Sequence, residues 1–147
     1  MVFGGNGRGD VLTELAQQQT ELLRVADLTK SEPAARSTAT QVLATNVHVT
    51  VSSSNEATLS LIKKSGTKVN DKTLGLKKNA ATDRKLADAA VNNTYEETFR
   101  AIMLSELTTY QRIAKKLQSG AKTKTEKEVL ADVVKDTSLL IGNPATD

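Results

Sequence analysis

The stretch Tyr95–Leu117, with the sequence YEETFRAIMLSELTTYQRIAKKL, decides the fold class of this chain. Its apolar and aromatic side chains recur every three or four residues, which is the spacing of one face of an α-helix. The members of this face, with one carboxylate among them, are Tyr95, Phe99, Ile102, Met103, Glu106, Tyr110, Ile113 and Leu117. The pattern predicts a long amphipathic helix that runs to Ser119-Gly120, where Gly120 is the expected C-terminal cap.

Helical patterns continue on both sides of this stretch. Upstream, the same helical region starts near Asp83 and is expected to break or kink at Asn92-Asn93. Downstream, Thr125-Glu126-Lys127-Glu128 is a capping box that predicts the start of a further helix. The expected buried face of that helix consists of Leu130, Val133, Val134, Thr137, Leu140 and Ile141, and Gly142-Asn143-Pro144 is expected to end it.

The N-terminal half of the sequence predicts two more helices joined by a short turn. The first extends from an N-cap at Asp10 to about Thr29, and the second begins at once at Ser31-Glu32-Pro33. Residues Val47–Val51 alternate like a β-strand, but residues 34–64 contain no Gly or Pro, so a helix ending before Gly66 is favoured. The side chains expected on its buried face are Ala39, Val42, Leu43, Val47, Val51, Leu59 and Ile62.

These elements predict an all-α protein, an antiparallel four-helix bundle made of two helical hairpins. A long, exposed and basic link over residues 65–81 is expected to join the hairpins, because this segment contains Gly66, Gly75 and many lysines. Residues 1–9 are glycine-rich and are interpreted as a flexible leader, residues 10–142 as one helical domain, and residues 143–147 as a tail.

The composition excludes several classes of site. The chain has no cysteine, which excludes disulfides, thiolate zinc sites, iron–sulfur ligation and thiol nucleophiles. No run of about 18 apolar residues is present, so no membrane span is expected. The first nine residues lack the apolar region of a signal peptide, so the signal of an exported form is expected to have been removed already.

Few residues are suited to a metal centre. Di-iron bundles use Glu-x-x-His motifs on facing helices, and here the only histidine, His48, has Thr45 three residues before it. Glu106 lies on the apolar face, where a carboxylate needs a partner, a raised pKa or a place at the edge of the face. The candidates for a reduced metal site are Glu106, Glu56 and His48, but the favoured interpretation is that the protein binds no metal and no cofactor.

The positive charge of the chain is concentrated in one segment. Residues 63–85 contain eight basic and two acidic side chains, whereas residues 1–62 and 86–147 are slightly acidic. The basic members, which form a candidate anion-binding set, are Lys63, Lys64, Lys68, Lys72, Lys77, Lys78, Arg84 and Lys85. The segment has no aromatic residue to stack on bases and a single arginine, so a solvated loop is favoured over a nucleic-acid interface.

The pattern Tyr95-Glu96-x-x-Phe99-x-x-x-Met103-Leu104-x-Glu106 resembles the signature of an exported bacterial family. This is a ferritin-like domain-of-unknown-function family often labelled as outer membrane proteins. Leu59, Ile62, Lys63, Lys64 and Gly66 match the end of the second helix of that family. Its two Asp-His pairs correspond here to Val51-Ser52 and Glu106-Leu107, so both signature histidines are missing.

The resemblance, together with the missing histidines, implies a ferritin-like helical bundle that is non-enzymatic, exported to the periplasm and engaged in a binding or structural role in the cell envelope. Two alternatives remain open. One is a degenerate ferritin-like protein that handles a metal or an oxidant, and the other is a cytoplasmic nucleic-acid-binding module that uses residues 63–85. The expected partner is a second copy of the chain or another envelope protein, and nucleic acid is less favoured.

Overall fold

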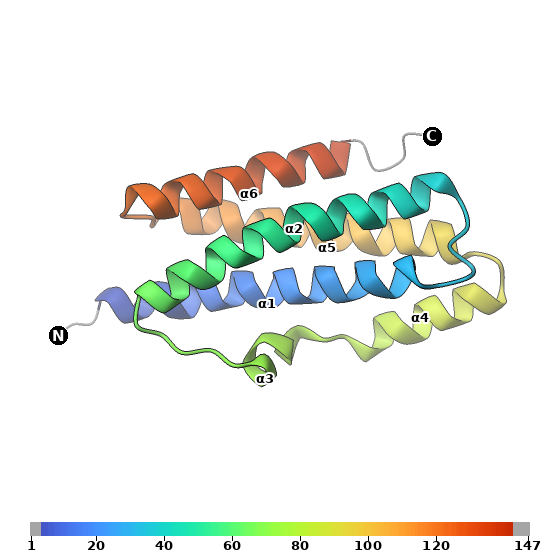
Figure 1. The fold of residues 1–147 in the computed structure, drawn as a ribbon, viewed down its shortest axis with the longest axis horizontal. Helices are drawn as coiled ribbons and strands as arrows, with labels where there is room; N and C mark the ends of the chain where they lie inside the picture. Colours follow the sequence, from blue (N-terminus) through green and yellow to red (C-terminus); the bar gives the residue numbers. More distant parts are fainter. Residues whose placement is uncertain (1–3, 143–147) are drawn as a thin grey trace.

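The computed structural model describes residues 4–142, and every regular element in this range is helical (Figure 1). The elements are α1 (Gly4–Lys30), α2 (Thr38–Lys64), α3 (Asp71–Leu74), the 3-10 turn η1 (Gly75–Lys77), α4 (Ala80–Val91), α5 (Tyr95–Gln118) and α6 (Lys124–Gly142). The prediction of an all-α fold is confirmed for these residues, while the expected tail at residues 143–147 lies outside the described range. None of the helices in this range has the length and hydropathy that crossing a membrane requires.

The four long helices pack side by side in the order α1, α2, α6, α5, with the main contacts between neighbours in this order and a smaller one across the bundle between α2 and α5. Figure 1 shows that α1 and α6 run in one direction while α2 and α5 run in the other, so that neighbours in this order are antiparallel. Because α2 and α5 run the same way, the chain has to return between them. It does so through α3, η1 and α4, of which α3 and η1 pack on α1 and α4 packs on α5.

A continuous apolar core fills the space between the long helices. Among its largest fully buried side chains are Leu15 and Leu22 on α1, Phe99 and Met103 on α5, and Leu130 on α6. Burial of side chains of this size contributes about 1.5–3 kcal/mol each to folding. The periodic face predicted for the stretch that is now α5 is therefore the face that packs on the other helices.

Residues Val47–Val51 are helical, as predicted, although they alternate like a strand. Val47 and Val51 are one turn apart and buried, whereas Val49 is 62% exposed. Packing of the α2 face against the core therefore overrides the local preference for a strand. The prediction that Val42 faces the core is wrong, because a residue five positions before Val47 is rotated about 140° around the helix axis from it, and Val42 is 49% exposed.

The second helix starts later than predicted. Ser37 caps α2, and its Oγ accepts a hydrogen bond from the Thr40 N–H at 3.1 Å. The segment before it is a turn in which the Glu32 carboxylate accepts a hydrogen bond from the Ala34 N–H at 3.1 Å. Pro33 lies in this turn and not in the first turn of the helix, so the expected helix start at Ser31-Glu32-Pro33 is wrong.

The last helix starts two residues earlier than predicted. Its cap is Thr123, whose Oγ1 accepts a hydrogen bond from the Glu126 N–H at 3.1 Å, and not Thr125. Both threonines stand three residues before a glutamate, so the sequence offers two capping boxes. The structure selects the first, because Arg8 pairs with the buried carboxylate of Glu126 while Thr125 and Glu128 are exposed.

The helical region that begins at Ala80 is broken at Asn92-Asn93, as predicted. α4 ends at Val91 and α5 begins at Tyr95. Between them, Asn93 has a φ of 61°, in the left-handed region that asparagine tolerates better than most residues. The break reverses the chain, and α4 packs against α5.

The segment between α2 and α4 is anchored along α1 by polar contacts. Gln17 Nε2 donates a hydrogen bond to the Thr73 carbonyl at 3.0 Å, and Lys77 Nζ lies 3.5 Å from Glu14 Oε2. These contacts come from polar side chains on the outer face of α1, which the apolar pattern of the sequence does not identify. The predicted exposed link at residues 65–81 is thus a partly helical strap that follows α1.

Gly9 allows this strap to approach α1 closely. α1 begins at Gly4, so Asp10 lies inside the helix and does not cap it. Gly9 is buried, and a Cβ atom at this position would lie 1.8 Å from Thr67 Oγ1 and 2.7 Å from Thr67 Cβ. Glycine is therefore required here by packing.

Gly120 also makes room for a neighbouring group. The expected C-terminal cap of α5 at Gly120 is wrong, because Ser119 is the cap residue and Gly120 does not have a positive φ. A Cβ atom at Gly120 would instead lie 2.9 Å from Arg8 Nη1. The missing side chain thus leaves space for the Arg8 guanidinium at the end of α5.

We expect Gly9→Ala to destabilise the protein by about 1–3 kcal/mol, because the overpacking against Thr67 exceeds the helix-propensity gain of about 0.5–1 kcal/mol. Urea unfolding measures this change. Gly75→Ala is the matched control, since no atom lies within 4 Å of its added Cβ. The double variant Gly9→Ala/Thr67→Ala is expected to recover part of the loss, and an unchanged stability of Gly9→Ala would contradict the close packing.

Candidate functional site

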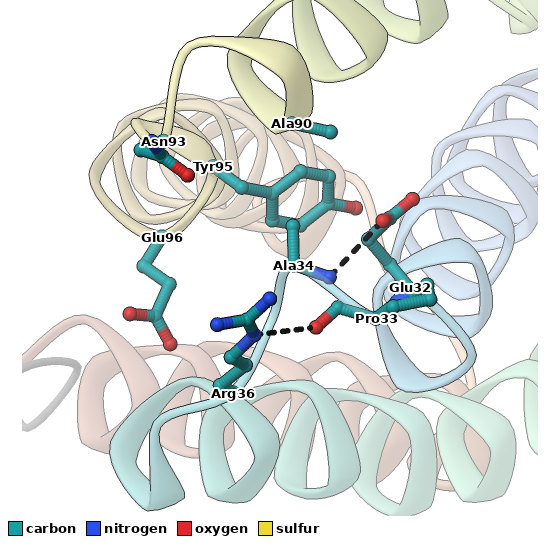
Figure 2. Close-up of a pocket in the computed structure, with 8 residues that line it drawn as sticks. All are labelled: Glu32, Pro33, Ala34, Arg36, Ala90, Asn93, Tyr95 and Glu96. Atoms are coloured by element: carbon teal, nitrogen blue, oxygen red, sulfur yellow. Dashed lines mark hydrogen bonds between the residues drawn. The ribbon is translucent and has the colours of Figure 1, made fainter.

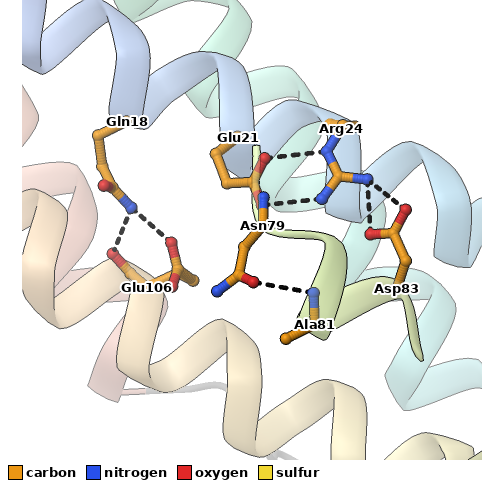
Figure 3. A network of polar contacts seen from close by, with 7 residues as sticks. All are labelled: Gln18, Glu21, Arg24, Asn79, Ala81, Asp83 and Glu106. Carbon is orange, nitrogen blue, oxygen red and sulfur yellow. Dashed lines mark hydrogen bonds and ion pairs between the residues drawn. The ribbon is translucent and has the colours of Figure 1, made fainter. Parts of the chain in front are cut away.

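The candidate metal ligands Glu106, His48 and Glu56 occupy separate places. Glu106 is half-buried on α5, and its Oε1 accepts a hydrogen bond from Gln18 Nε2 at 2.7 Å (Figure 3). His48 Nδ1 on α2 lies 2.8 Å from Asp27 Oδ1 on α1, and Glu56 is exposed on α2. Gln18 and Asp27 are nine residues apart, so these two contacts are separated by about 13 Å along α1. Within residues 4–142, no three His, Cys, Asp or Glu side chains lie close enough together to hold a metal ion.

The interior contains a hydrogen-bonded group of neutral side chains, here called the central network, which consists of Gln19, Asn55, Thr58 and Tyr110. Gln19 Nε2 donates to Thr58 Oγ1 at 3.0 Å and to the Tyr110 hydroxyl at 2.8 Å. Gln19 Oε1 accepts a hydrogen bond from Asn55 Nδ2 at 2.9 Å. The Gln19 amide is fully buried, and its hydrogen bonds connect α1 to α2 and α5. Satisfied polar groups of this kind fix the register of packed helices.

Both tyrosines of the chain are hydrogen-bonding groups of the interior. Burial raises the pKa of Tyr110 to about 12, although its hydrogen bonds to Gln19 and Ser54 act in the opposite direction. Burial also raises the pKa of Tyr95, whose hydroxyl lies 2.9 Å from Thr29 Oγ1. Because both hydroxyls stay protonated at neutral pH, neither supplies a phenolate for chemistry.

A charged group fastens α4 to α1 (Figure 3). Arg24 Nε and Nη2 donate to the two carboxylate oxygens of Glu21 at 2.9 and 2.8 Å, and Arg24 Nη1 donates to Asp83 Oδ1 at 2.7 Å. The Asn79 N–H donates to Glu21 Oε2 at 3.2 Å. The hydrogen bond to Glu21, with a contribution from Asp83, raises the pKa of Arg24. These side chains position the start of α4 on α1.

A cavity of about 380 Å³ lies where the turn between α1 and α2 meets the turn between α4 and α5 (Figure 2). It is lined by Glu32, Pro33, Ala34, Arg36, Ala90, Asn93, Tyr95 and Glu96. Its charged side chains already have backbone partners. Glu32 accepts from the Ala34 N–H at 3.1 Å, and Arg36 Nε donates to a carbonyl at 3.2 Å. Glu96 accepts from the Ser37 N–H, which lowers the Glu96 pKa, and this contact joins the two turns.

The basic side chains of residues 63–85 are distributed over several elements. Lys63 and Lys64 end α2, Lys72 lies on α3, Lys77 in η1, Arg84 and Lys85 on α4, and Lys68 and Lys78 lie in the connections. Lys77 is near a carboxylate of α1, as described above. Lys64 differs from the others, because it lines a cavity together with two basic residues from distant parts of the chain, Arg8 and Lys122.

This cavity, here called the end pocket, has a volume of about 450 Å³. It lies where α1 begins, α2 ends and α6 begins, which is the opposite end of the molecule from the cavity of Figure 2. The residues that line it are Arg8, Leu12, Leu61, Lys64, Ser65, Lys122, Thr123, Thr125 and Glu126. Leu12 and Leu61 belong to the buried core, so the pocket has an apolar floor and a polar rim.

The charged groups of the end pocket are three basic side chains and one carboxylate. Arg8 Nη2 donates to the Glu126 carboxylate and to the Leu117 carbonyl, the latter at 3.2 Å. Burial lowers the pKa of the Arg8 guanidinium, and its Nε is buried with no hydrogen-bond partner among the described residues. Lys64 and Lys122 are exposed at the rim, so the four groups together carry a net positive charge.

The sequence analysis does not identify the basic segment around Lys122, because charges were summed over long stretches of the chain. Residues 112–127 contain six basic side chains and one acidic side chain, but their charge cancels when it is summed over residues 86–147. Net charge summed over shorter stretches of about 15 residues would identify this second basic segment. The glycine-rich sequence places Arg8 in the expected leader, and nothing in the sequence pairs it with Glu126, which is 118 residues away.

In comparisons with known proteins, no family model, no curated protein and no solved structure matches this chain. The candidate site is therefore defined by the geometry of the chain itself.

We expect the stability of the protein to fall as the pH rises from about 10 to about 12. In this window the unfolded Tyr110 loses its proton while the folded one keeps it, which favours the unfolded state by up to about 3 kcal/mol. Denaturant unfolding at a series of pH values measures the effect. Tyr110→Phe is expected to flatten this part of the profile, and identical profiles for the two proteins would contradict a buried, protonated Tyr110.

Proposed function

We propose that this chain is a non-enzymatic, ferritin-like four-helix bundle of the cell envelope that acts by binding an anionic partner at its basic end. The observation that carries the proposal is the end pocket. Two basic segments that are far apart in the sequence, one ending α2 and one between α5 and α6, meet there around an apolar floor. Basic groups brought together in a concave site are the usual way to attract and hold an anion.

The order and direction of the long helices support the bundle part of the proposal. Neighbours alternate in direction, and one long connection joins the two hairpins, as in bundles of the ferritin type. The residues that carry the family resemblance also fit, because Tyr95, Phe99 and Met103 are buried together on one face of α5.

The position of Leu107 supports binding over metal chemistry. Leu107 stands where the resemblance places a histidine, and its side chain is fully buried in the apolar core. On the adjacent turn of α5, the Tyr110 hydroxyl accepts a hydrogen bond from Gln19 within the central network. The interior face of α5 is thus occupied by apolar packing and by satisfied neutral groups.

Retention on immobilised heparin tests the basic end as a binding surface. We expect Lys64→Glu/Lys122→Glu to elute at a clearly lower salt concentration than the unaltered protein, because two rim cations become anions. Lys30→Glu/Lys135→Glu is the matched control, since it changes the net charge equally at exposed residues outside the end pocket. The control is expected to elute close to the unaltered protein.

An equal loss of retention in both double variants would contradict the proposal, since binding would then follow net charge alone. A larger loss in Lys72→Glu/Lys78→Glu/Lys85→Glu would favour the nucleic-acid alternative. A stoichiometric metal retained through dialysis would favour the metal-handling alternative.

The envelope location is tested by fractionating the source cells and sequencing the N-terminus of the mature protein. We expect the protein in the periplasmic or envelope fraction. A purely cytoplasmic protein would contradict the exported role and leave the basic end to act on a cytoplasmic anion.

A further inference from the structure

We propose that the end pocket binds one amphiphilic anion, a phosphate or carboxylate head group attached to an alkyl chain. This inference rests on the proposed function and specifies its ligand. It is carried by the combination, in one cavity, of an apolar floor, basic side chains at the rim and a buried carboxylate that the pocket already holds.

The floor of the end pocket is suited to an alkyl chain. Leu12 and Leu61 are 2% and 9% exposed, and both belong to the core while also lining the cavity. A volume of about 450 Å³ lies within the range of about 300–1,000 Å³ that is typical of small-molecule sites. An apolar chain placed on this floor gains binding free energy with each methylene group that it buries. A bare inorganic anion would leave this surface unused.

The rim of the end pocket is suited to an anionic head group. Arg8 stabilises the buried carboxylate of Glu126, which shows that the site accommodates an anionic oxygen next to the core. Arg8 Nε remains without a partner among the described residues, and Lys64 and Lys122 add two exposed cations. A phosphate or carboxylate at the rim would accept hydrogen bonds from the two lysines and balance their charge.

The start of α6 also favours an anionic head group in the end pocket. Thr123 caps this 19-residue helix, and both Thr123 and Thr125 line the end pocket. The N-terminus of a helix carries a partial positive charge and N–H groups without helical partners. The head group is therefore placed between the rim lysines and the first turn of α6, with the chain directed towards Leu12 and Leu61.

Isothermal titration calorimetry with n-decyl phosphate, kept below its micelle concentration, tests the ligand class. We expect one molecule to bind per chain. Inorganic phosphate, which has the head alone, and decanol, which has the chain alone, are each expected to bind at least about tenfold more weakly, a difference of about 1.4 kcal/mol.

Two variants locate the binding in the end pocket. Lys64→Glu/Lys122→Glu is expected to weaken decyl phosphate binding at least about tenfold, and Lys30→Glu/Lys135→Glu is expected to leave it unchanged. Leu61→Gln is expected to weaken decyl phosphate more than inorganic phosphate, with thermal unfolding as the check that it folds. If Leu61→Gln does not fold, the comparison of the two lysine double variants still tests whether decyl phosphate binds in the end pocket.

The outcomes separate this inference from the proposed function. Equal binding of inorganic phosphate and decyl phosphate, with retention on heparin still dependent on Lys64 and Lys122, overturns the amphiphile but keeps the anion-binding end. Equal binding of decyl phosphate to both lysine double variants overturns the end pocket as its site. If retention on heparin is also independent of Lys64 and Lys122, both proposals fail.

Cosedimentation with phosphatidylglycerol vesicles distinguishes a membrane lipid from a free amphiphile as the source of this head group. Vesicle binding that is lost in Lys64→Glu/Lys122→Glu, alongside binding of monomeric decyl phosphate, assigns the pocket to a lipid. Binding of the monomer alone assigns it to a free amphiphile. Vesicle binding without monomer binding overturns the pocket as the ligand site.

Discussion

The contact between Arg8 and Glu126 is the constraint on which the basic end of the molecule depends. Glu126 is 5% exposed, and a carboxylate buried to this extent costs several kcal/mol unless a cation and hydrogen bonds compensate it. Arg8 supplies that cation from α1, a helix that is not a neighbour of α6 in the packing order. The pair therefore ties the first helix to the last across the end of the core, with Gly120 leaving space for the guanidinium. The end pocket forms around this tie.

A second constraint comes from the uncharged hydrogen-bonding side chains of the interior. Gln19 reaches α2 through Thr58 and Asn55, and α5 through Tyr110. A shift of any of these helices by one turn would leave several buried donors and acceptors unpaired, at about 1–3 kcal/mol for each group. The central network thus sets the register of the long helices with uncharged groups, while the buried carboxylates of Glu21 and Glu126 lie outside it and are each paired with an arginine. This division is consistent with a protein that binds at one end and uses its interior only for structure.

The sequence predicts the structural features that depend on the spacing of apolar residues along the helices. It does not predict the features that depend on individual polar contacts. The faces of α5 and α6, the helical state of Val47–Val51 and the break at Asn92-Asn93 follow from spacing and backbone preference. The caps at Ser37 and Thr123 do not, because each competes with a nearby residue of equal propensity and tertiary contacts select between them. Lys64 is the one basic residue of the end pocket that the sequence identifies as an anion-binding candidate. Arg8 and Lys122 are distant in the sequence, and only the fold brings them next to Lys64.

Amide proton–nitrogen correlation spectra recorded during a decyl phosphate titration show directly whether the end pocket binds the proposed anionic ligand. We expect the largest shifts on Lys64, Ser65 and residues 122–126, with small shifts at the central network. Shifts centred on residues 71–85, or on the cavity around Tyr95, would contradict binding in the end pocket.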